Sequence, residues 1–289
     1  MENRITGTTG LLALIGSPVG HSGSPAMYNY SFQKLGLDYA YVAFDVQQEE
    51  VERAIEAIRT FKMRGCNVTM PDKTEAVKYM DELSDAARLI GAVNTIVNDN
   101  GRLTGYITDG EGFVNNLRDH GVEIAGKKIT VAGGGGAATA IQVQCALDGA
   151  KEISIFNIKD AFFARTLETA EKIKRQKPAC IVNVYDIADE AKMNEEISSS
   201  DIFANATIVG MKPMENESVV KDASAFRPGL VVCDAVYNPK QTRLLREASE
   251  AGCTCISGEG MLLWQGAAAF KLYTGQDMPV QEVKERFFQ

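Results

Sequence analysis

The sequence predicts an α/β fold in two lobes, and two observations lead to this prediction. Short apolar segments of strand length alternate with longer segments of helical periodicity along the chain. That alternation is typical of a parallel sheet covered by helices. In addition, the apolar segment 128–132 runs into four consecutive glycines, Gly133–Gly136, and an alanine-rich segment follows at once. A glycine-rich turn between a strand and a helix predicts a Rossmann-type dinucleotide-binding domain in the second lobe.

Individual residues of this turn have separate expected roles. We expect Gly133 to make the sharp turn, Gly135 to let the backbone approach a diphosphate, and Ala138 to let the helix pack closely on the strand. The N–H groups at the helix start, with their partial positive charge, would then hold the diphosphate. A flexible glycine loop is the plain alternative. The strand 152–157, one helix later, with Asp160 after it, favours the dinucleotide site.

Length and composition set outer limits. The 289 residues suffice for two domains with separate cores. A net charge of −8 offers no general attraction to nucleic acid or to an anionic membrane, whereas local positive groups can still bind an anionic small molecule. The apolar segment 11–15 is too short for a signal peptide or a membrane span, so we expect a cytoplasmic protein. Six scattered cysteines and two histidines predict reduced thiols and no metal site.

The first lobe begins with an apolar strand at 11–16 and a helix at 24–35, with Pro25 in the first turn, where its fixed φ is suitable. Ser24 is expected to cap that helix. Apolar spacing then predicts, in order, strand 38–45, helix 49–61, strand 65–69, a short helix 74–79, strands 94–98 and 103–106, and helix 110–120. The turn 99–101 between the last two strands contains Asn-Gly, which predicts a hairpin.

The second lobe repeats the alternation. Its expected strands are 129–132, 152–157, 181–185, 201–204 and 230–234, and its expected helices are 138–147, 161–174, 194–199, 242–251 and 261–273. We expect residues 1–107 to form a substrate-binding and catalytic domain, and residues 108–259 to form the dinucleotide-binding domain. The C-terminal helices, from about 260 to 289, are expected to pack back on the first domain.

Polar side chains gather where predicted strands end, which is where open α/β sheets bind ligands. In the segment 21–25 one hydroxyl suffices for a helix cap, so Ser22 is left over for another role. In the segment 67–73, Asn67 and Thr69 share one face of a strand, and Lys73 follows a proline. A lysine beside a proline turn is usually a solvated charge, but the nearby polar segments 91–95 and 105–110 favour a ligand site.

Seven segments, taken in order, resemble the shikimate dehydrogenases, and they are most similar to the quinate/shikimate dehydrogenase branch. The segments are 21–25, 67–73, 91–95, 108–110, 205–211, 236–239 and 258–266. The resemblance runs nearly end to end. It implies a nicotinamide-dependent oxidoreductase of the shikimate pathway, in aromatic amino acid biosynthesis. Such an enzyme interconverts shikimate and 3-dehydroshikimate, or quinate and 3-dehydroquinate, by hydride transfer.

The resemblance also implies roles for particular residues, with Lys73 and Asp109 as the catalytic pair. The residues that it implies around the substrate are Ser22, Ser24, Asn67, Thr69, Lys73, Asn94, Asp109, Tyr237 and Gln265. Together with the glycine turn, it assigns the cofactor to Gly133, Gly134, Gly135, Gly136, Ala137, Asn157, Lys159, Asp160, Thr207, Val236, Tyr237 and Gly258. The chain departs from the family at Ile107, where Asn is usual, and at Tyr28, where His is common. Neither departure replaces a proton donor.

The segment 156–160 predicts NAD as the preferred cofactor. Strictly NADP-dependent relatives carry an arginine where this chain has Ile158, which offers no charge to a 2′-phosphate. Asp160 can accept hydrogen bonds from ribose hydroxyls and would repel a phosphate. Lys159 leaves some tolerance for NADP. Asp160 could also cap a helix that starts at residue 161, and the two roles are compatible.

Several alternatives stay open at this point. Another two-lobed dehydrogenase, of the aminoshikimate or methylene-folate type, is one; a non-catalytic NAD-binding regulatory module is another, although the presence of Lys73 and Asp109 argues against it. His120 is a rival base, but we expect it at a surface helix end. The pair Tyr30 and Lys34 matches a short-chain reductase pattern in the wrong lobe. We expect only small-molecule ligands and either a monomer or a homodimer.

Overall fold

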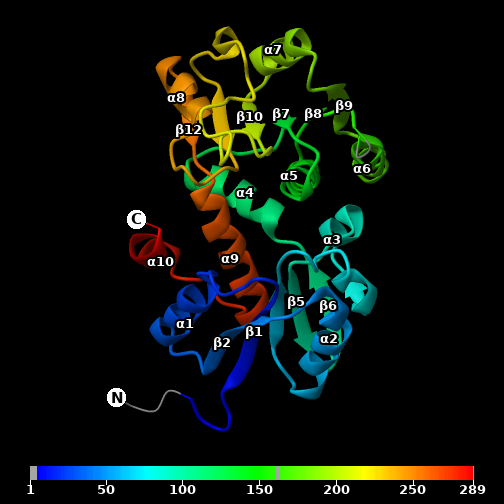
Figure 1. The fold of residues 1–289 in the computed structure, drawn as a ribbon, viewed down its shortest axis with the longest axis vertical. Coiled ribbons are helices and arrows are strands. Elements are labelled where there is room, and N and C mark those ends of the chain that lie inside the picture. Colours follow the sequence, from blue (N-terminus) through cyan, green and yellow to red (C-terminus); the bar gives the residue numbers. More distant parts are fainter. Residues whose placement is uncertain (1–4, 161–162, 289) are drawn as a thin grey trace. The chain divides into compact units, whose positions relative to one another are not determined.

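The computed structural model describes residues 5–160 and 163–288. The chain divides into two compact units (Figure 1). The first consists of Met1–Thr108 and Gln265–Gln289, and the second of Asp109–Trp264. The C-terminal segment thus joins the first unit from Gln265 onward, a point inside helix α9 (Glu259–Thr274).

The first unit is built on a mixed sheet in the order β2-β1-β3-β5-β6-β4. Its strands are β1 (Gly10–Gly16), β2 (Tyr39–Asp45), β3 (Gly65–Val68), β4 (Glu82–Leu83), β5 (Thr95–Asp99) and β6 (Arg102–Tyr106). Strand β1 pairs in parallel with β2 and β3, whereas β5 is antiparallel to both β3 and β6. The C-terminal ends of β1, β3 and β6 therefore meet the N-terminal end of β5 along one edge of the sheet.

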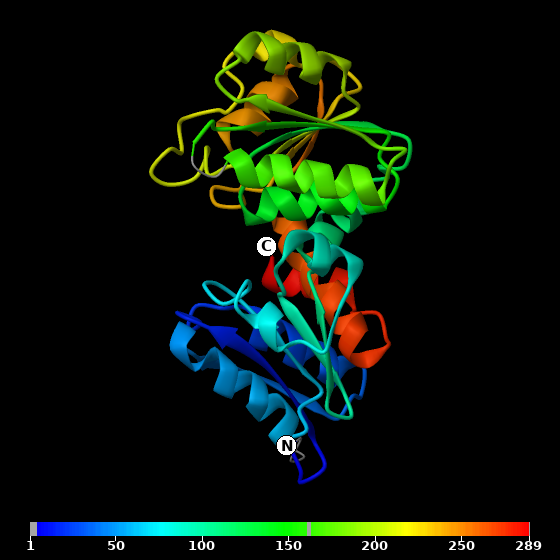
Figure 2. The same cartoon turned by 90° about the vertical axis from the view of Figure 1, so that its right-hand side faces the viewer.

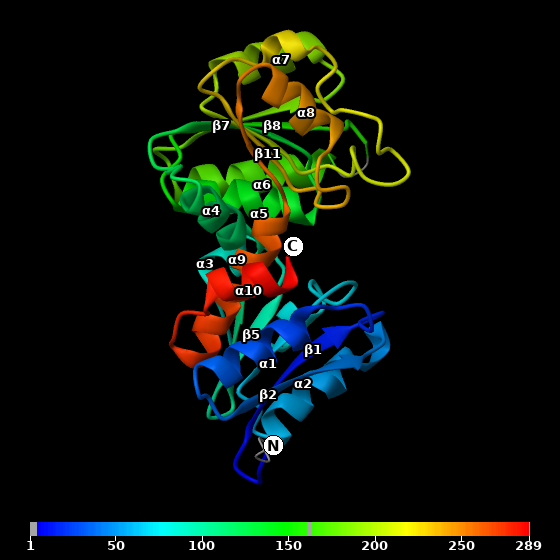
Figure 3. The ribbon, with the colours of Figure 1, turned by 90° about the vertical axis from the view of Figure 1, so that its left-hand side faces the viewer.

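Helices cover both faces of this sheet. They are α1 (Ser24–Lys34), α2 (Val51–Thr60), the short α3 (Asp85–Ile90), the C-terminal part of α9, and α10 (Val280–Phe287). Helices α1 and α10 lie on the face opposite α2 (Figure 3). An aromatic core holds α9 in place, since Tyr28 of α1 stacks on Tyr41 of β2 and on Phe270 of α9. The Tyr28 hydroxyl also donates to the Gly266 carbonyl at 3.0 Å.

The second unit contains a parallel six-stranded sheet in the order β12-β11-β10-β7-β8-β9. Its strands are β7 (Lys128–Ala132), β8 (Glu152–Asn157), β9 (Ile181–Asp186), β10 (Ile202–Asn205), β11 (Val231–Asp234) and β12 (Thr254–Ile256). Two runs of strands start next to each other at β7 and β10 and extend in opposite directions. This order is that of dinucleotide-binding folds, which bind their ligand at the reversal point.

Helices lie on both faces of the second sheet. They are α4 (Asp109–Asp119), α5 (Gly136–Leu147), α6 (Phe163–Gln176), α7 (Glu190–Ser199) and α8 (Arg243–Glu250). Helices α4, α5 and α6 lie on one face, and α7 and α8 lie on the other (Figures 2 and 3). Because both faces are covered, the central strands are almost entirely apolar and buried.

The α/β fold, the parallel sheet of the second unit and most of the expected elements are confirmed. The hairpin prediction is also confirmed, since Asn100 and Gly101 both have positive φ between β5 and β6. The expected helix at 74–79 is only a 3₁₀ turn over Ala76–Tyr79. Helix α7 starts four residues earlier than expected because the Asp189 side chain accepts the N–H of Lys192 and caps it. Strands β4 and β12 and helix α3 were not expected, whereas α10 lies within the C-terminal segment 260–289 that was expected to be helical.

The cap predicted for α1 is wrong. The N-cap position belongs to Gly23, and no side chain caps the helix. Instead the Ser22 hydroxyl accepts the N–H of Ser24 at 3.2 Å. The hydroxyl that seemed left over is therefore the one that satisfies a backbone donor at the helix start. In the second unit, a helix was expected to start at residue 161. That residue lies outside the described residues, and α6 is described from Phe163.

Two general features of the described chain bear on function. No helix within residues 5–160 and 163–288 combines the length and apolar character needed to cross a membrane. In the same residues, no group of three or more His, Cys, Asp or Glu side chains is placed to hold a metal ion.

Candidate functional site

A hydrogen-bonded group of side chains lies at the edge of the first sheet where the strands end; we call Asn67, Asn94, Thr95 and Thr108 the strand-end cluster. The Asn67 amide donates to the Asn94 carbonyl and to the Thr95 hydroxyl, each at 3.1 Å. The Asn94 side-chain oxygen accepts the N–H of Thr108 at 2.9 Å and the Thr95 hydroxyl at 2.9 Å. All four side chains are buried. The cluster fixes the backbone from which the neighbouring polar residues project.

Two of the residues predicted at the substrate are thereby inside the protein. Asn94 is 3% exposed, and the Asn67 oxygen accepts the Tyr41 hydroxyl at 2.8 Å. Gln265 joins the cluster from α9, because the Thr108 hydroxyl lies 3.5 Å from its side-chain oxygen. Sequence reasoning missed the parts played by Thr95, Thr108 and Tyr41. Thr108 lies within a segment that carried the family resemblance, whereas nothing local marks Tyr41.

Lys73 and Thr69 follow strand β3 in the same unit. Thr69 donates its N–H to the Ile15 carbonyl at 2.9 Å, and Asp72 returns its N–H to the Thr69 carbonyl at 3.0 Å. The Lys73 carbonyl accepts the N–H of Val93 at 2.8 Å, so the backbone of the lysine is tied to the segment that precedes Asn94. The Lys73 side chain is half-buried. A half-buried amine on an anchored turn is suited to acting on a bound ligand.

The residue next to the lysine was also missed. Asp72 is fully buried, and both of its carboxylate oxygens lack a hydrogen-bond partner among the described residues. Burial, together with the nearby Glu75 carboxylate, raises the pKa of Asp72. Asp109, the other predicted catalytic residue, is the first residue of α4 in the second unit and directly follows Thr108.

The two departures from the family pattern have structural explanations. Ile107 is buried, as an apolar replacement for asparagine requires. Tyr28 uses its hydroxyl to hold α9, and burial raises the pKa of that hydroxyl, so it does not ionise near neutral pH. Tyr28 is therefore an internal support of α9 in the first unit.

In the second unit the glycine turn follows β7 as predicted. Gly133 has φ +121°, and a side chain there would press on the Ala206 carbonyl oxygen. Its own carbonyl accepts the Gln142 side-chain amide at 2.9 Å. Gly134 has a different reason to be glycine, since a Cβ would overlap the side chains of Asn157 and Thr166. Gly135 faces open space and precedes the first residue of α5.

A pocket with a volume of about 380 Å³ opens beside this turn; we call it the glycine-loop pocket. Its walls are the start of α5, the loop after β10 and the loop after β11. The residues are Gly135, Gly136, Ala137, Ala206, Thr207, Ile208, Met211, Lys212, Ala235, Val236, Tyr237 and Asn238. Six of them were predicted at the cofactor. The pocket lies beyond the C-terminal ends of β7, β10 and β11, where this fold binds its ligand.

The other predicted cofactor residues lie outside the lining of this pocket. Gly258 lies close against the backbone of Ala235, a lining residue, and a Cβ at this position would overlap that backbone. Asn157 donates its amide to the Thr166 hydroxyl at 2.9 Å, which ties the end of β8 to α6. Lys159 and Asp160 are exposed, and Ile158 is 60% exposed despite being apolar.

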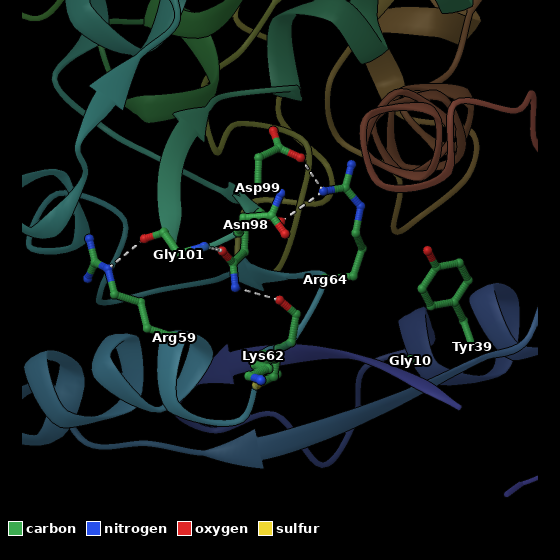
Figure 4. A pocket seen from close by; sticks show the side chains of 10 residues that line it. Gly10, Tyr39, Arg59, Lys62, Arg64, Asn98, Asp99 and Gly101 are labelled. Carbon is green, nitrogen blue, oxygen red and sulfur yellow. Dashed lines mark hydrogen bonds and ion pairs between the residues drawn. The ribbon is translucent and has the colours of Figure 1, made fainter. Parts of the chain in front are cut away.

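A larger cavity, with a volume of about 670 Å³, lies in the first unit, at the ends of the strands opposite to the strand-end cluster (Figure 4). None of the predicted site residues lines it. Its two arginines are used structurally. Arg64 donates to the Tyr273 carbonyl of α9 at 2.7 Å and pairs with Asp99, while Arg59 donates to the Gly101 carbonyl and pairs with Asp81. The cavity therefore marks where the hairpin and the C-terminal segment are held, and size alone does not identify the site.

The rival catalytic residues neither belong to the strand-end cluster nor line the glycine-loop pocket. His120 is exposed directly after α4, where Nδ1 lies 2.8 Å from the Asn116 carbonyl, as expected for a helix end. Tyr30 and Lys34 both bond to Glu282 of α10, and so they attach the last helix to α1.

Comparisons with known proteins show which family the chain belongs to. The model of the shikimate dehydrogenase substrate binding domain matches residues 14–96, and that of the shikimate 5'-dehydrogenase C-terminal domain matches residues 258–286. Shikimate dehydrogenase (NADP(+)) from Listeria monocytogenes serotype 4b is 53% identical over 288 residues, covering 100% of this chain and 99% of its own. Quinate/shikimate dehydrogenase from Escherichia coli O17:K52:H18 is 47% identical, covering 97% of each chain.

A solved structure is equally similar. Shikimate 5-dehydrogenase from Listeria monocytogenes, crystallised with shikimate and NAD, has a TM-score of 0.95 and 52% identity, covering 99% of this chain and 98% of its own. Identity of this size over the full length of both chains exceeds what a shared fold alone produces. The chain therefore belongs to the shikimate dehydrogenase family of oxidoreductases.

Proposed function

We propose that the chain interconverts shikimate and 3-dehydroshikimate, quinate and 3-dehydroquinate, or both pairs, with NAD preferred to NADP. In this proposal the first unit binds the substrate and the second binds the dinucleotide. The observation that carries it is the likeness, over 99% of this chain, to a structure that holds shikimate and NAD. The relatives compared above are named for shikimate alone or for both acids, so quinate belongs in the same test.

The second unit is suited to a nicotinamide dinucleotide by its own geometry. Gly135 leaves open space next to the N-terminus of α5, where backbone N–H groups can hold a diphosphate. Gly136 and Ala137 continue that surface, and Val236 and Tyr237 form the facing wall of the glycine-loop pocket. When bound, the nicotinamide would accept or return the hydride.

The first unit supplies the groups for the substrate. Lys73 would exchange the proton of the reacting hydroxyl or stabilise the oxyanion as it forms. Asp109 would orient Lys73 or bind a neighbouring hydroxyl. The remaining side chains proposed at the substrate's carboxylate and hydroxyls are Ser22, Ser24, Asn67, Thr69, Asn94, Gln265 and, from the second unit, Tyr237. Of these, Asn67 acts through the cluster, because its amide and its oxygen are already bonded inside the protein.

The cofactor preference rests on the segment after β8. Ile158 is exposed there and offers neither charge nor hydrogen bond, so binding a 2′-phosphate gains nothing from it. Asp160 adds a negative charge on the same exposed segment and is the proposed partner of the ribose hydroxyls. The Listeria monocytogenes serotype 4b relative is named for NADP, and a Listeria monocytogenes structure holds NAD, so the two cofactors are measured side by side.

The test is the initial rate of reduction of NAD and of NADP, each with shikimate and with quinate. We expect turnover with at least one acid and a higher kcat/KM with NAD. The variant I158R should shift the ratio toward NADP if this position reads the 2′-phosphate. A matched control is I181R, which changes an equally exposed isoleucine at the first residue of β9, outside the lining of the glycine-loop pocket, and should leave the ratio unchanged.

Each outcome separates one part of the proposal from the rest. Equal or better kcat/KM with NADP would refute the cofactor preference and leave the reaction intact. Turnover with only one acid would define the substrate. No turnover in any pairing, from folded protein that binds dinucleotide, would refute the proposed reaction in favour of a regulatory module.

A further inference from the structure

A buried carboxylate lies directly beneath the glycine-loop pocket without lining it. Asp234 is the last residue of β11 and is only 2% exposed. Its neighbour across the sheet is Asn205, the last residue of β10, with which it is in register. The two residues thus stand at the roots of the two loops that form most of the pocket wall, 206–212 and 235–238.

Three donors converge on the Asp234 carboxylate. Oδ1 accepts the side-chain amide of Asn205 at 2.9 Å and the N–H of Val236 at 3.0 Å. Oδ2 accepts the hydroxyl of Thr242 at 2.6 Å. The Thr242 hydroxyl in turn accepts the N–H of Leu245 and caps α8. One carboxylate therefore holds the first turn of the loop after β11 and the start of the helix that follows it.

Asn205 carries the connection to the other loop. Its side-chain oxygen accepts the N–H and the hydroxyl of Thr207, at 3.1 and 2.7 Å. Its amide donates to the Val209 carbonyl at 3.0 Å as well as to Asp234. The Thr207 hydroxyl then accepts the N–H of Val209 at 3.1 Å. The loop after β10 is thus folded around Asn205, and Asn205 is held by Asp234.

We infer that Asp234 is a positioning residue for the cofactor, which fixes the loops 206–212 and 235–238 relative to each other through Asn205 and Val236. This inference rests on the proposed function, because it assumes that the glycine-loop pocket takes a nicotinamide dinucleotide. Asp234 itself does not line the pocket. It acts through Thr207, Val236 and Tyr237, which do.

The chemistry of the site requires a carboxylate. All three partners of Asp234 donate, and an ionised carboxyl only accepts. An amide in its place would direct an N–H₂ group at one of the donors. Burial raises the pKa of Asp234 to about 6, while the bonds from Thr242, Val236 and Asn205 hold it from rising further. The group is therefore ionised at neutral pH, and hydrogen bonds to a charged acceptor are stronger than neutral ones.

The test compares D234N with the wild-type enzyme by titrating NAD and NADP and by steady-state kinetics. We expect the Kd for dinucleotide and its KM to rise about tenfold to hundredfold, as for the loss of a hydrogen bond to a charged group. At saturating cofactor, kcat should stay within about threefold, and the KM for shikimate should not change. A merely structural role would lower the amount of folded enzyme without splitting KM from kcat.

The matched control is D201N. Asp201 precedes β10, at the opposite end of the strand from Asn205, and likewise accepts a backbone N–H, that of Lys128 at 2.9 Å. The substitution D201N should lower the free energy of unfolding without changing dinucleotide affinity. If D234N does not fold, T242V removes one donor to the same carboxylate, and T242S restores it. Weaker binding in T242V and normal binding in T242S would support the inference.

Three results would overturn the inference. One is wild-type affinity in D234N, and another is equal weakening in D234N and D201N. The third is a wild-type enzyme that binds neither NAD nor NADP, which would refute the proposed function as well. If the wild type binds dinucleotide and D234N binds it equally well, only the role of Asp234 fails.

Discussion

The two candidate sites of this chain are built from different materials. The strand-end cluster of the first unit is made of side chains, in which amides and hydroxyls bond to one another from the ends of three strands, β3, β5 and β6. The glycine-loop pocket of the second unit is lined in part by residues with little or no side chain: Gly135, Gly136, Ala137, Ala206 and Ala235. Its wall includes Gly135 and Gly136, and the side chains that shape it, Asn205 and Asp234, lie behind it.

Because of this difference, we expect substitutions in the two sites to destabilise the protein or weaken binding for different physical reasons. A substitution in the strand-end cluster leaves buried donors and acceptors unpaired, which costs stability. A substitution in the glycine turn adds atoms where backbone must pass or a ligand must approach, and it acts through strain or exclusion. The predictions below test whether that division holds.

The largest effect is expected from K73A. Removing the amine should lower kcat by roughly two to four orders of magnitude, the usual range for a general acid or base. Dinucleotide affinity, which the proposed function assigns to the second unit, should not change. Turnover by stopped-flow and Kd by titration measure the two quantities. The control is K62A, an exposed lysine of the larger cavity. A K73A rate near that of the wild type would show that Lys73 does not carry the proton transfer.

The next effect is acid destabilisation of the second unit. Glu196 of α7 is buried; although burial alone would raise its pKa, hydrogen bonds from Lys128, Lys192 and Ser154 lower it to about 2. Folding lowers the pKa of Glu196, so the ionised carboxylate stabilises the folded protein above about pH 4.5. This contribution to the free energy of unfolding is lost as the pH falls toward 2. The lost free energy of unfolding is about 3 kcal/mol.

Urea unfolding of wild-type and E196Q enzyme from pH 6 to pH 3 measures this contribution. The comparison between the two proteins is needed because Asp234, with its raised pKa, acts in the opposite direction over the same range. The difference in unfolding free energy between the wild type and E196Q should narrow as the pH falls. E195Q, a change at an exposed neighbour, is the control and should show no gap. A constant gap would mean that Glu196 is not ionised in the way the geometry implies.

The glycine turn is expected to separate strain from exclusion. G133A places a side chain at φ +121° against the Ala206 carbonyl and should cost about 1–3 kcal/mol of unfolding free energy. G135A meets open space and should leave stability nearly unchanged, yet its methyl group occupies the approach to the α5 N-terminus. Both should bind NAD more weakly. Thermal unfolding and NAD titration of the pair distinguish the two causes; normal binding in G135A would contradict the proposed diphosphate site.

A loss of stability as large as that of G133A, with no effect on dinucleotide binding, is expected from N67A in the strand-end cluster. The change leaves the Tyr41 hydroxyl and the Asn94 carbonyl without the bonds that Asn67 makes, which should cost about 1–3 kcal/mol. The KM for dinucleotide should not move. N183A, at a half-buried asparagine on β9, is the matched control and should cost less. If N67A is as stable as N183A, the cluster does not hold the edge of the first sheet together.

The sequence predicted the second unit better than the first, and the reason is physical. The turn at Gly133, the helix α5 and the strand β8 are local patterns in consecutive residues. The strand-end cluster depends on hydrogen bonds between residues far apart in the chain, such as Asn67 with Asn94, and the attachment of α9 depends on a bond of the same kind, from Tyr28 to Gly266. No period or spacing reveals such bonds. In the first unit, the family resemblance located the polar segments but not how they bond.

The same reasoning explains the particular misses. Ser24 does not cap α1: the N-cap position belongs to Gly23, and the Ser22 hydroxyl accepts the N–H of Ser24. The sequence alone does not distinguish which of the two serines bonds to the backbone. Asp234 was not predicted as a site residue because it touches the loops rather than the pocket. The assignment of Lys73 and Asp109 to catalysis stays a prediction, tested by the kinetics proposed above.

The first unit is assembled from both ends of the chain, and this affects how the protein is made. Tyr28 and its partner Tyr41 are complete early in synthesis, but Phe270 and Tyr273, which also pack on Tyr28, emerge from the ribosome only after the second unit. The aromatic face stays uncovered while the whole second unit is translated and can fold. The first unit is thus the last to be completed although it is the first to be started, and a stop codon shortly before Gln265 would release a chain with only one finished half.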